Sequence, residues 1–434
     1  MKKIISTVAA LGLVVGVAGT ASAVDYTMTG KYVLEGYMMN GADGAGVSTM
    51  DDAGTDSAWV QTFLVKPTIT VNDKIKMFGE VRFAKDSDWG DDPKGSGDGY
   101  DSVNDIDVEY VYMEYMSELG KVRMGRTPAG AWGSDFLSTT ANANRLMWWP
   151  SFVAQPFSLV VFTQKTAEND WDNSSSDSDN DLYEIALDYK VDGLLAQVGY
   201  DYINNKTNST YDSQYSLFKA NLAMAAGPVN IGGEFGWYFG DAQDFDASTA
   251  TDVDVDAMGL MLDVNTKLDT LTVGGMYFWA QGDDDATDDD QEAIMVSTSS
   301  GIGDDFNPLY ILTGDHTNVF NDDEYPGGNP TLYNAGVHAL AVYADLAVSD
   351  KLTLHSVLGY AFADTTDRLE TPGNDVDDEY GWELNLGAKY KLLDNLTYEA
   401  HAGYVFTGDF FEDALGNEND EDIYLLSHHL TMTF

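Results

Sequence analysis

The amino-acid sequence predicts an all-β fold, a transmembrane antiparallel up-and-down β-barrel of about 18 strands, with about 16 as the alternative count. Three observations predict it. Apolar and polar residues alternate with period two along most of the chain, which is the signal of a half-buried strand. Short turns alternate with long acidic loops, as they do in bacterial barrels. The last stretch, IYLLSHHLTMTF, has one apolar face and one face of Ser, His and Thr, which suits a closing strand against lipid.

The first 23 residues predict a cleaved secretory signal. Lys2 and Lys3 precede a largely apolar run, and Ala21-Ser22-Ala23 is a small-residue cleavage site. The alternative, a membrane helix, needs a longer apolar run, and no later stretch reaches that length either. Residues 24–434 are therefore predicted to form a single barrel domain outside the cytoplasm.

Composition excludes several classes of protein. With 72 acidic against 22 basic residues the formal net charge is −50, which excludes nucleic acid as a partner. The chain has no cysteine, so disulfides and thiolate metal sites are excluded too. The acids gather in loops between aromatic strands, whereas a soluble acidic protein or a disordered acidic tail would spread them evenly.

The strands can be followed in order. Val24 to Asn40, Ala58 to Val71 and Ile75 to Ala84 alternate apolar and polar residues. An acidic Gly-rich loop separates the first two of these stretches, and a short turn separates the second from the third. The weakest segments are Asn144 to Trp149 and Val253 to Val264. A soluble sandwich would also alternate, but its core would not need Tyr and Trp near so many strand ends. The aromatic girdles of a membrane barrel do need them.

Eight tight turns and nine long loops connect these strands, which places both ends of the barrel on the side of the tight turns. Seven turns are evident from their residues, and the eighth is expected near Trp149-Pro150-Ser151. The seven lie near Asn72-Asp73, Glu118-Leu119-Gly120, Asp192-Gly193, Gly227-Pro228, Leu268-Asp269, Asp350-Lys351 and Asp394-Asn395.

The stretch from Glu114 to Phe136, EYMSELGKVRMGRTPAGAWGSDF, has the most specific sequence motif of the chain. Its strand, Gly-Arg and Pro/Gly/acid loop resemble the fifth strand and third loop of Gram-negative general porins. In that family the third loop folds into the lumen and sets the aperture. The resemblance implies an inward-folded constriction loop at about 127–143. The loop sequence here, PAGAWGSD, differs from the family's Pro-Glu-Phe-Gly-Gly pattern, and its acidic residue is Asp135.

The terminal Phe434 resembles the assembly signal of bacterial outer-membrane barrels, and the whole pattern is most similar to the outer-membrane homotrimeric porins. This resemblance implies a homotrimer in the bacterial outer membrane, reached after secretion through the inner membrane. Lipid and lipopolysaccharide would surround it. It implies a water-filled channel for passive diffusion of ions and small hydrophilic solutes. By the same analogy the first and last strands lie at the subunit contact, where Gly30 and Gly36 would permit close approach.

Twelve of the 22 Lys and Arg residues fall between Lys31 and Lys165. This is the part of the barrel that would surround the inserted loop. Opposed basic and acidic walls would impose a transverse field on an aperture and order the water in it. Acidic loops at the mouth favour weak cation selectivity. The candidate constriction residues are Arg82, Arg123, Arg126, Asp135, Arg145, Lys66, Lys76 and Glu80.

No cofactor and no enzymatic activity are expected, because nucleophile-elbow, phosphate-loop and metal-hydrolase motifs are absent. Two acidic runs, Asp283 to Glu292 and Asp177 to Asp181, leave weak Ca²⁺ or Mg²⁺ binding as an alternative, although neither matches a calcium loop. His428 and His429 cannot share a strand face, which disfavours a paired-histidine site.

The longest connection, at about 283–332, contains the apolar FNPLYIL from Phe306 to Leu312. We expect it to fold over the mouth or onto a neighbouring subunit; simple packing within the loop is the alternative. Two other functions stay open for the chain: a substrate-specific outer-membrane channel, and a structural surface barrel whose acidic loops bind cations.

Overall fold

The computed structural model describes thirteen segments of the chain, beginning at Val24. None of the helices within these segments is long and apolar enough to cross a membrane. The described residues are 24–40, 56–88, 106–128, 132–134, 136–137, 142–169, 178–245, 250–285, 287–294, 306–313, 335–370, 375–415 and 422–434.

Eighteen strands of these segments join, each to the next, into one antiparallel sheet that closes where β1 pairs with β19. They are β1 (Asp25–Met39), β2 (Asp56–Asn72), β3 (Ile75–Asp88), β4 (Asp107–Ser117), β5 (Gly120–Thr127), β6 (Ala143–Pro150), β7 (Phe157–Ala167), β8 (Asn180–Val191), β9 (Leu194–Asn205), β10 (Tyr211–Ala226), β11 (Val229–Phe245), β12 (Val253–Leu268), β13 (Leu271–Ala280), β15 (Val337–Ala347), β16 (Leu352–Phe362), β17 (Glu379–Leu393), β18 (Leu396–Thr407) and β19 (Ile423–Thr433).

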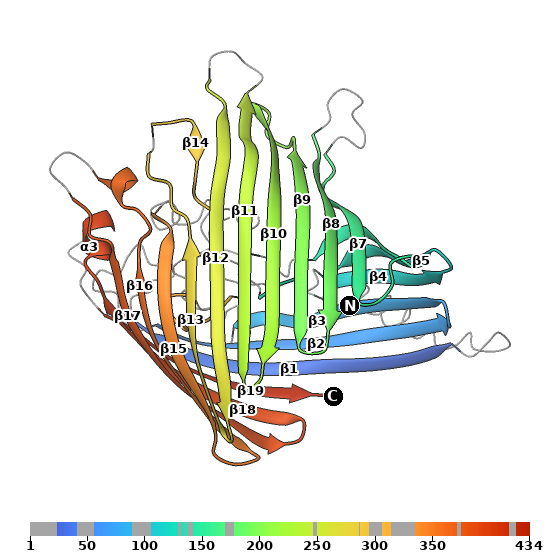
Figure 1. Ribbon diagram of the computed structural model, residues 1–434. Helices are drawn as coiled ribbons and strands as arrows, with labels where there is room; N and C mark the ends of the chain where they lie inside the picture. Colours follow the sequence, from blue (N-terminus) through green and yellow to red (C-terminus); the bar gives the residue numbers. More distant parts are fainter. Residues whose placement is uncertain are drawn as a thin grey trace, which may run out of the picture.

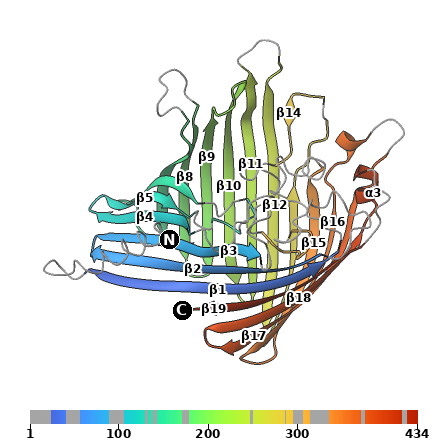
Figure 2. The same ribbon diagram turned by 180° about the vertical axis from the view of Figure 1, so that it is seen from behind.

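In the described segments, three small elements are not part of this barrel wall. The two-residue β14 (Asp290–Gln291) pairs in parallel with the beginning of β12, at Asp254 and Val255. A 3₁₀ turn, η2 (Asp367–Leu369), and a short helix, α3 (Phe410–Leu415), lie in the connections after β16 and β18. In Figure 1 the strands β8–β12 stand upright while β1–β3 run across them, and Figure 2 shows the same crossing from behind. Strands in the opposite walls of a tilted barrel cross in this way.

The predicted fold class is confirmed, and the count is 18 rather than 16. The eight tight turns are present, the eighth of them at residues 151–156, directly after Pro150. One connection on the other rim differs from the predicted long loops. Residues 206–210 suffice to join β9 to β10, because Asn205 and Asn208 accept hydrogen bonds from the backbone and hydroxyl of Thr207 and Thr210. Such Asx turns reverse the chain in few residues.

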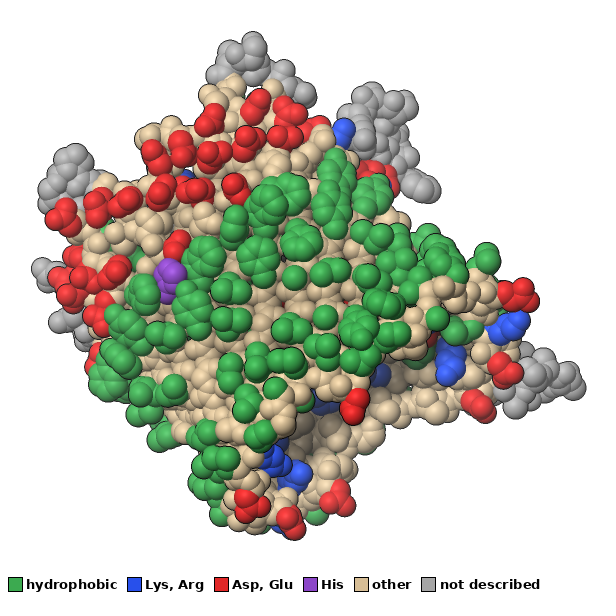
Figure 3. Space-filling view, viewed as in Figure 1, with side chains coloured by type: hydrophobic (Ala, Val, Ile, Leu, Met, Phe, Trp, Pro, Cys, Tyr) green, Lys and Arg blue, Asp and Glu red, His purple; other side chains and the backbone are tan. Residues whose placement is uncertain are grey.

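The outer surface carries the apolar face of the barrel. Large apolar side chains are exposed along nearly every strand, for example Val342 at 59% and Leu386 at 55%. They form a broad band in Figure 3, and acidic side chains gather above it on the rim that carries the long loops. An apolar belt of this kind fits the hydrocarbon layer of a bilayer.

The main hydrophobic core lies inside the barrel rather than between sheets. On β15–β19 the inward positions Ala339, Ala361, Val405 and Leu425 are fully buried. At these positions the wall is apolar on its inner face as well, which departs from the predicted polar interior. Two chain segments pack against the wall from within. The first, of which residues 132–134 and 136–137 are described, packs on β11–β13. The second, residues 306–313, packs on β15–β19 and excludes water from this part of the wall, which is the physical reason for the departure.

The length of β5 and β6 explains how the first of these segments enters. Each has 8 residues, so each spans about 26 Å, against about 56 Å for the 17 residues of β2. The connection between β5 and β6 therefore leaves the wall well below the rim.

Candidate functional site

The first charged cluster lies on the inner face of β2–β4. Lys66 Nζ lies 2.9 Å from Glu80 Oε2, and Arg82 Nε lies 3.0 Å from Glu80 Oε1 and 3.3 Å from Glu109 Oε1. Asn142, at the end of the inserted connection, donates to Glu109 Oε2 at 2.9 Å. Both carboxylates are almost fully buried, whereas Lys66 keeps about half of its side chain exposed. Three of the predicted residues thus form one ion-paired group.

A second cluster follows on β4–β6. Arg123 lies directly opposite Glu114 in the strand register, and its Nη2 approaches Glu114 Oε1 at 2.7 Å. Its guanidinium also lies 4.7 Å from the ring centre of Tyr112. Lys121 Nζ lies 3.9 Å from the ring centre of Trp149 and 3.7 Å from Glu114. The aromatic rings hold these cations against the wall.

The other predicted constriction residues are not brought into these clusters. Arg145 donates to Gln164 Oε1 at 2.8 Å and to the Thr127 carbonyl at 2.9 Å, so it supports the base of the inserted connection. Arg126 donates to the Glu109 carbonyl at 2.7 Å. Lys76 is exposed and lies opposite Glu114 in the register. Asp135 lies outside the described residues.

The structure adds a buried triad that sequence reasoning missed. Lys219 on β10 lies 2.7 Å from Glu184 and 2.9 Å from Asp201, and all three side chains are less than a tenth exposed. The tight turn at Asp192-Gly193 places Glu184 opposite Asp201 in the register. The position of this turn in the sequence could therefore have predicted that the two carboxylates are neighbours. Gly199 leaves room for the lysine, because a Cβ there would lie 2.6 Å from Lys219 Cε.

The tip of the first inserted segment is held by Glu234 on β11, which was also missed. Its carboxylate accepts the backbone N–H of Ser134 and Leu137, the latter at 3.0 Å, and the Ser134 hydroxyl at 2.7 Å. Trp132 covers the triad, with its ring centre 4.9 Å from Lys219 Nζ. The segment thus reaches from the β5–β6 wall to β10 and β11.

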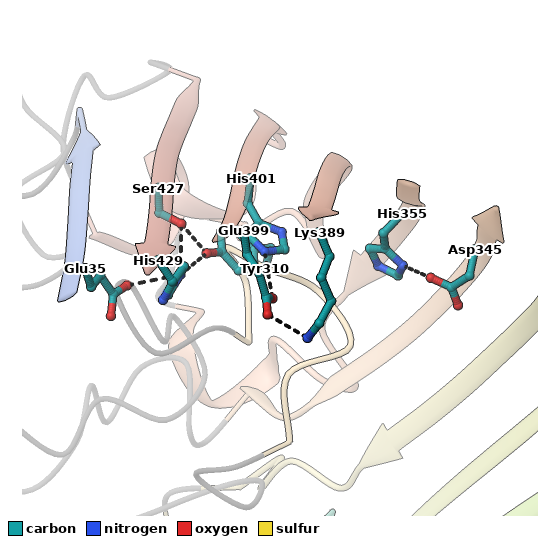
Figure 4. Close-up of polar contacts among 9 residues, drawn as sticks. All are labelled: Glu35, Tyr310, Asp345, His355, Lys389, Glu399, His401, Ser427 and His429. Carbon is teal, nitrogen blue, oxygen red and sulfur yellow. Dashed lines mark hydrogen bonds and ion pairs between the residues drawn. The ribbon is translucent and has the colours of Figure 1, made fainter. Parts of the chain in front are cut away.

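A third polar group lines the inner face of β1 and β15–β19 (Figure 4). Tyr310, from the second inserted segment, stacks on His401 with ring centres 4.9 Å apart and hydrogen-bonds Ser427. His401 and His429 lie 6.0 Å apart between ring centres. The sequence argument that His428 and His429 occupy opposite faces holds, since His428 packs against Trp59 outside. It could not foresee that His401 and His429 meet across neighbouring strands.

Two further pairs of a basic and an acidic side chain lie along this wall in Figure 4. Lys389 lies 2.6 Å from Glu399, and His355 lies 2.6 Å from Asp345. In the described part of the chain, no three His, Asp or Glu side chains gather in a way that could hold a metal ion. In the acidic run at 283–292, Asp283 pairs with Arg368 instead. Burial raises the pKa of Asp283 despite this cation.

The terminal residue Phe434 lies at the seam of the barrel. Its backbone exchanges hydrogen bonds of 2.8 and 3.1 Å with Gly30, and a Cβ on Gly30 would lie 2.2 Å from its ring. The space outside Gly36 is filled by His428 and Trp59 in the same way. These two glycines therefore receive aromatic rings of their own chain.

Comparison with solved structures supports the fold. Pseudomonas aeruginosa OccK9 (OpdG) matches with a TM-score of 0.58 and 12% identity, covering 94% of this chain and 98% of that one. OccK8 (OprE) of the same organism gives 0.56 and 11%, with the same coverage. No protein-family model and no curated protein matches the chain. The fold is that of the outer-membrane porin-type barrels, as the resemblance predicted.

Proposed function

We propose that this protein is an outer-membrane channel through which ions and small hydrophilic solutes diffuse passively. The observation that carries the proposal is the inner wall of β2–β6. Ion-paired Lys66, Glu80, Arg82, Glu114 and Arg123 face the interior of a closed barrel whose outside is apolar. Charged side chains at membrane depth are tolerated where they line water.

The same arrangement favours a channel that is narrowed by a segment of the chain folded into the barrel. Residues 132–134 and 136–137, between β5 and β6 in sequence, lie against Lys219 on β10 and Glu234 on β11, so solutes would pass between them and the cations of β2–β6. This supports the predicted constriction near Arg123 and Arg145. Two inserted segments, rather than one, also favour the alternative of a substrate-specific channel, because they leave a smaller opening with more defined polar partners.

The test is conductance in planar bilayers, combined with solute uptake into liposomes. Purified, folded protein should give stepwise currents, and uptake of small sugars and amino acids should follow. Uptake that rises linearly with concentration supports general diffusion, whereas saturation by one solute class supports the substrate-specific channel. Folded protein that neither conducts nor admits solutes would leave the structural surface barrel. Current steps in groups of three would support the homotrimer.

A further inference from the structure

We propose that the segment Phe306–Thr313 is a second wall of the constriction, and that Glu383 on β17 is the residue that positions it. This inference rests on the proposed channel function. It assigns a role to a segment that the sequence placed over the mouth or on a neighbouring subunit. The structure instead seats it inside its own barrel.

The wall beneath the segment is shaped to receive it. Leu309, Ile311 and Leu312 are fully buried against the inner face of β15–β19. Gly359 and Gly403 provide the seats, because a Cβ at Gly359 would lie 2.3 Å from Leu309 Cδ2 and one at Gly403 would lie 3.0 Å from Ile311 Cδ1. An inner wall facing only water would be polar here. The apolar inner face therefore belongs to the docked segment.

Glu383 holds the backbone of the segment. Its carboxylate is fully buried and accepts the N–H groups of Ile311 at 2.7 Å and Leu312 at 2.8 Å, and the side-chain amide of Asn385 at 2.7 Å. A buried carboxylate is costly unless such donors surround it. Thr313 closes the turn by bonding the backbone of Leu309 in both directions. The segment is thus a compact turn fastened at one carboxylate.

The side of the segment that faces the lumen is uncharged. Asn307 is exposed, and Pro308 and Tyr310 are half-buried. His401 and Ser427 fix Tyr310 (Figure 4), so the ring cannot swing freely. This neutral surface covers part of the polar wall of β16–β19.

The two inserted segments support one another. Phe306 lies 5.0 Å from Phe136 and 5.2 Å from Phe278 between ring centres. Together they fill the part of the barrel next to β11–β19. The open path is thereby displaced toward the cations of β2–β6, and the second segment limits its width.

The direct test replaces Glu383 by Gln. The amide keeps the shape, but it loses the charge and turns its own N–H groups toward the donors of the segment. We expect open-channel conductance to rise about 1.5-fold or more, because the narrowest section dominates the resistance of a pore. Larger sugars should then enter liposomes. The matched control is Asp345→Asn, which removes another inner-wall carboxylate that bonds His355.

A second variant undocks the segment and leaves Glu383 intact. Gly359→Leu fills the seat of Leu309 and should raise conductance and the size limit in the same direction. Gly275→Leu is its control, because a Cβ there meets only a carbonyl oxygen at 3.6 Å. Heat-modifiable mobility on gels shows in each case whether the barrel is folded.

Rescue separates positioning from general destabilisation. The chain has no cysteine, so Leu309→Cys with Gly359→Cys introduces one defined pair, at two positions that face each other: a Cβ at Gly359 would lie 3.4 Å from Leu309 Cγ. Oxidation of this pair in the Glu383→Gln background should restore the wild-type conductance and size limit. If wild-type protein does not conduct, the proposed function fails. If it conducts, and neither undocking variant changes conductance or size limit, the second wall is refuted.

Discussion

At the scale of single residues, several buried charges inside this barrel are paired with an opposite charge. Lys219, Glu184 and Asp201 are the clearest case, because all three are buried and lie within 3 Å of a partner. A buried ion pair contributes little net stability, yet removing one partner is expensive, since the charge left behind has no water to solvate it.

Lys219→Met tests this directly. It leaves two carboxylates side by side in a buried site, and we expect a loss of about 3–5 kcal/mol of unfolding free energy. The measurement is the midpoint of denaturant unfolding in detergent. Lys389→Met is the control, because Lys389 keeps 53% of its side chain exposed in its pair with Glu399. An exposed pair is worth about 0–1 kcal/mol. Equal losses in the two variants would contradict the argument.

Asp364, in the connection after β16, predicts a pH dependence. Burial would raise its pKa, but hydrogen bonds from His338 at 2.7 Å, Gly282 N at 2.9 Å and Trp279 Nε1 at 2.8 Å outweigh burial and lower it. The ordinary value is 3.8. A lowered folded pKa stabilises the fold above that pH, and this contribution is lost as pH falls through the folded value.

The thermal midpoint should therefore drop below about pH 4, and it should drop less in Asp364→Asn. The comparison of the two midpoints between pH 6 and pH 2 checks this. Parallel curves for wild type and variant would show that other carboxylates set the acid limit.

At the scale of elements, two inserted segments are fastened by the same device. Each offers two backbone N–H groups to one buried carboxylate on the inner wall: Ser134 and Leu137 to Glu234, and Ile311 and Leu312 to Glu383. In each, a glycine near the carboxylate admits an apolar side chain of the segment, Gly236 for Leu137 and Gly403 for Ile311. A segment held in this way is ordered without being part of the sheet.

Gly133→Ala tests the first fastening. Gly133 has a φ of 74°, and a Cβ on it would lie 2.1 Å from Glu234 Oε2, so any side chain there displaces the tip. We expect noisier single-channel currents and an altered reversal potential, with the barrel still folded. Gly232→Ala, where the nearest atom would be 3.8 Å away, should behave as wild type. Identical traces from both variants would show that the tip does not border the path.

At the scale of the whole molecule, closure of the barrel depends on the pairing of its first and last strands. Phe434 ends the chain and lays its ring over Gly30, 6.4 Å from the ring centre of Phe63. An aromatic ring over a strand glycine shields the backbone hydrogen bonds beneath it.

A double-mutant cycle measures this contact. Phe434→Ala and Gly30→Leu should each lower the unfolding free energy by about 1–3 kcal/mol, the first through lost packing and the second through a clash. The double variant should lose less than the sum, because the clash disappears with the ring. Unfolding midpoints of the four proteins supply the data. Strict additivity would mean that the ring does not act through Gly30.

Much of the fold could be predicted. Period-two alternation, tight turns and the terminal Phe depend on neighbours in sequence, and they predicted the barrel, its strand count and the Lys66, Glu80 and Arg82 face. Arg126 and Lys76 were predicted at the constriction but lie outside the charged clusters. Strand alternation and composition could not predict this, because they do not determine which basic side chain pairs with which carboxylate.

By itself, the sequence determined the barrel, the apolar outer face and the acidic rim, because these follow from local periodicity and from loop composition. Only the tertiary structure decided what fills the interior. Glu234 and Glu383 lie about a hundred and about seventy residues from the backbone groups they hold, and the Phe136–Phe306 contact joins two separate loops. Contacts across a closed barrel depend on strand order and register, and no local pattern encodes them.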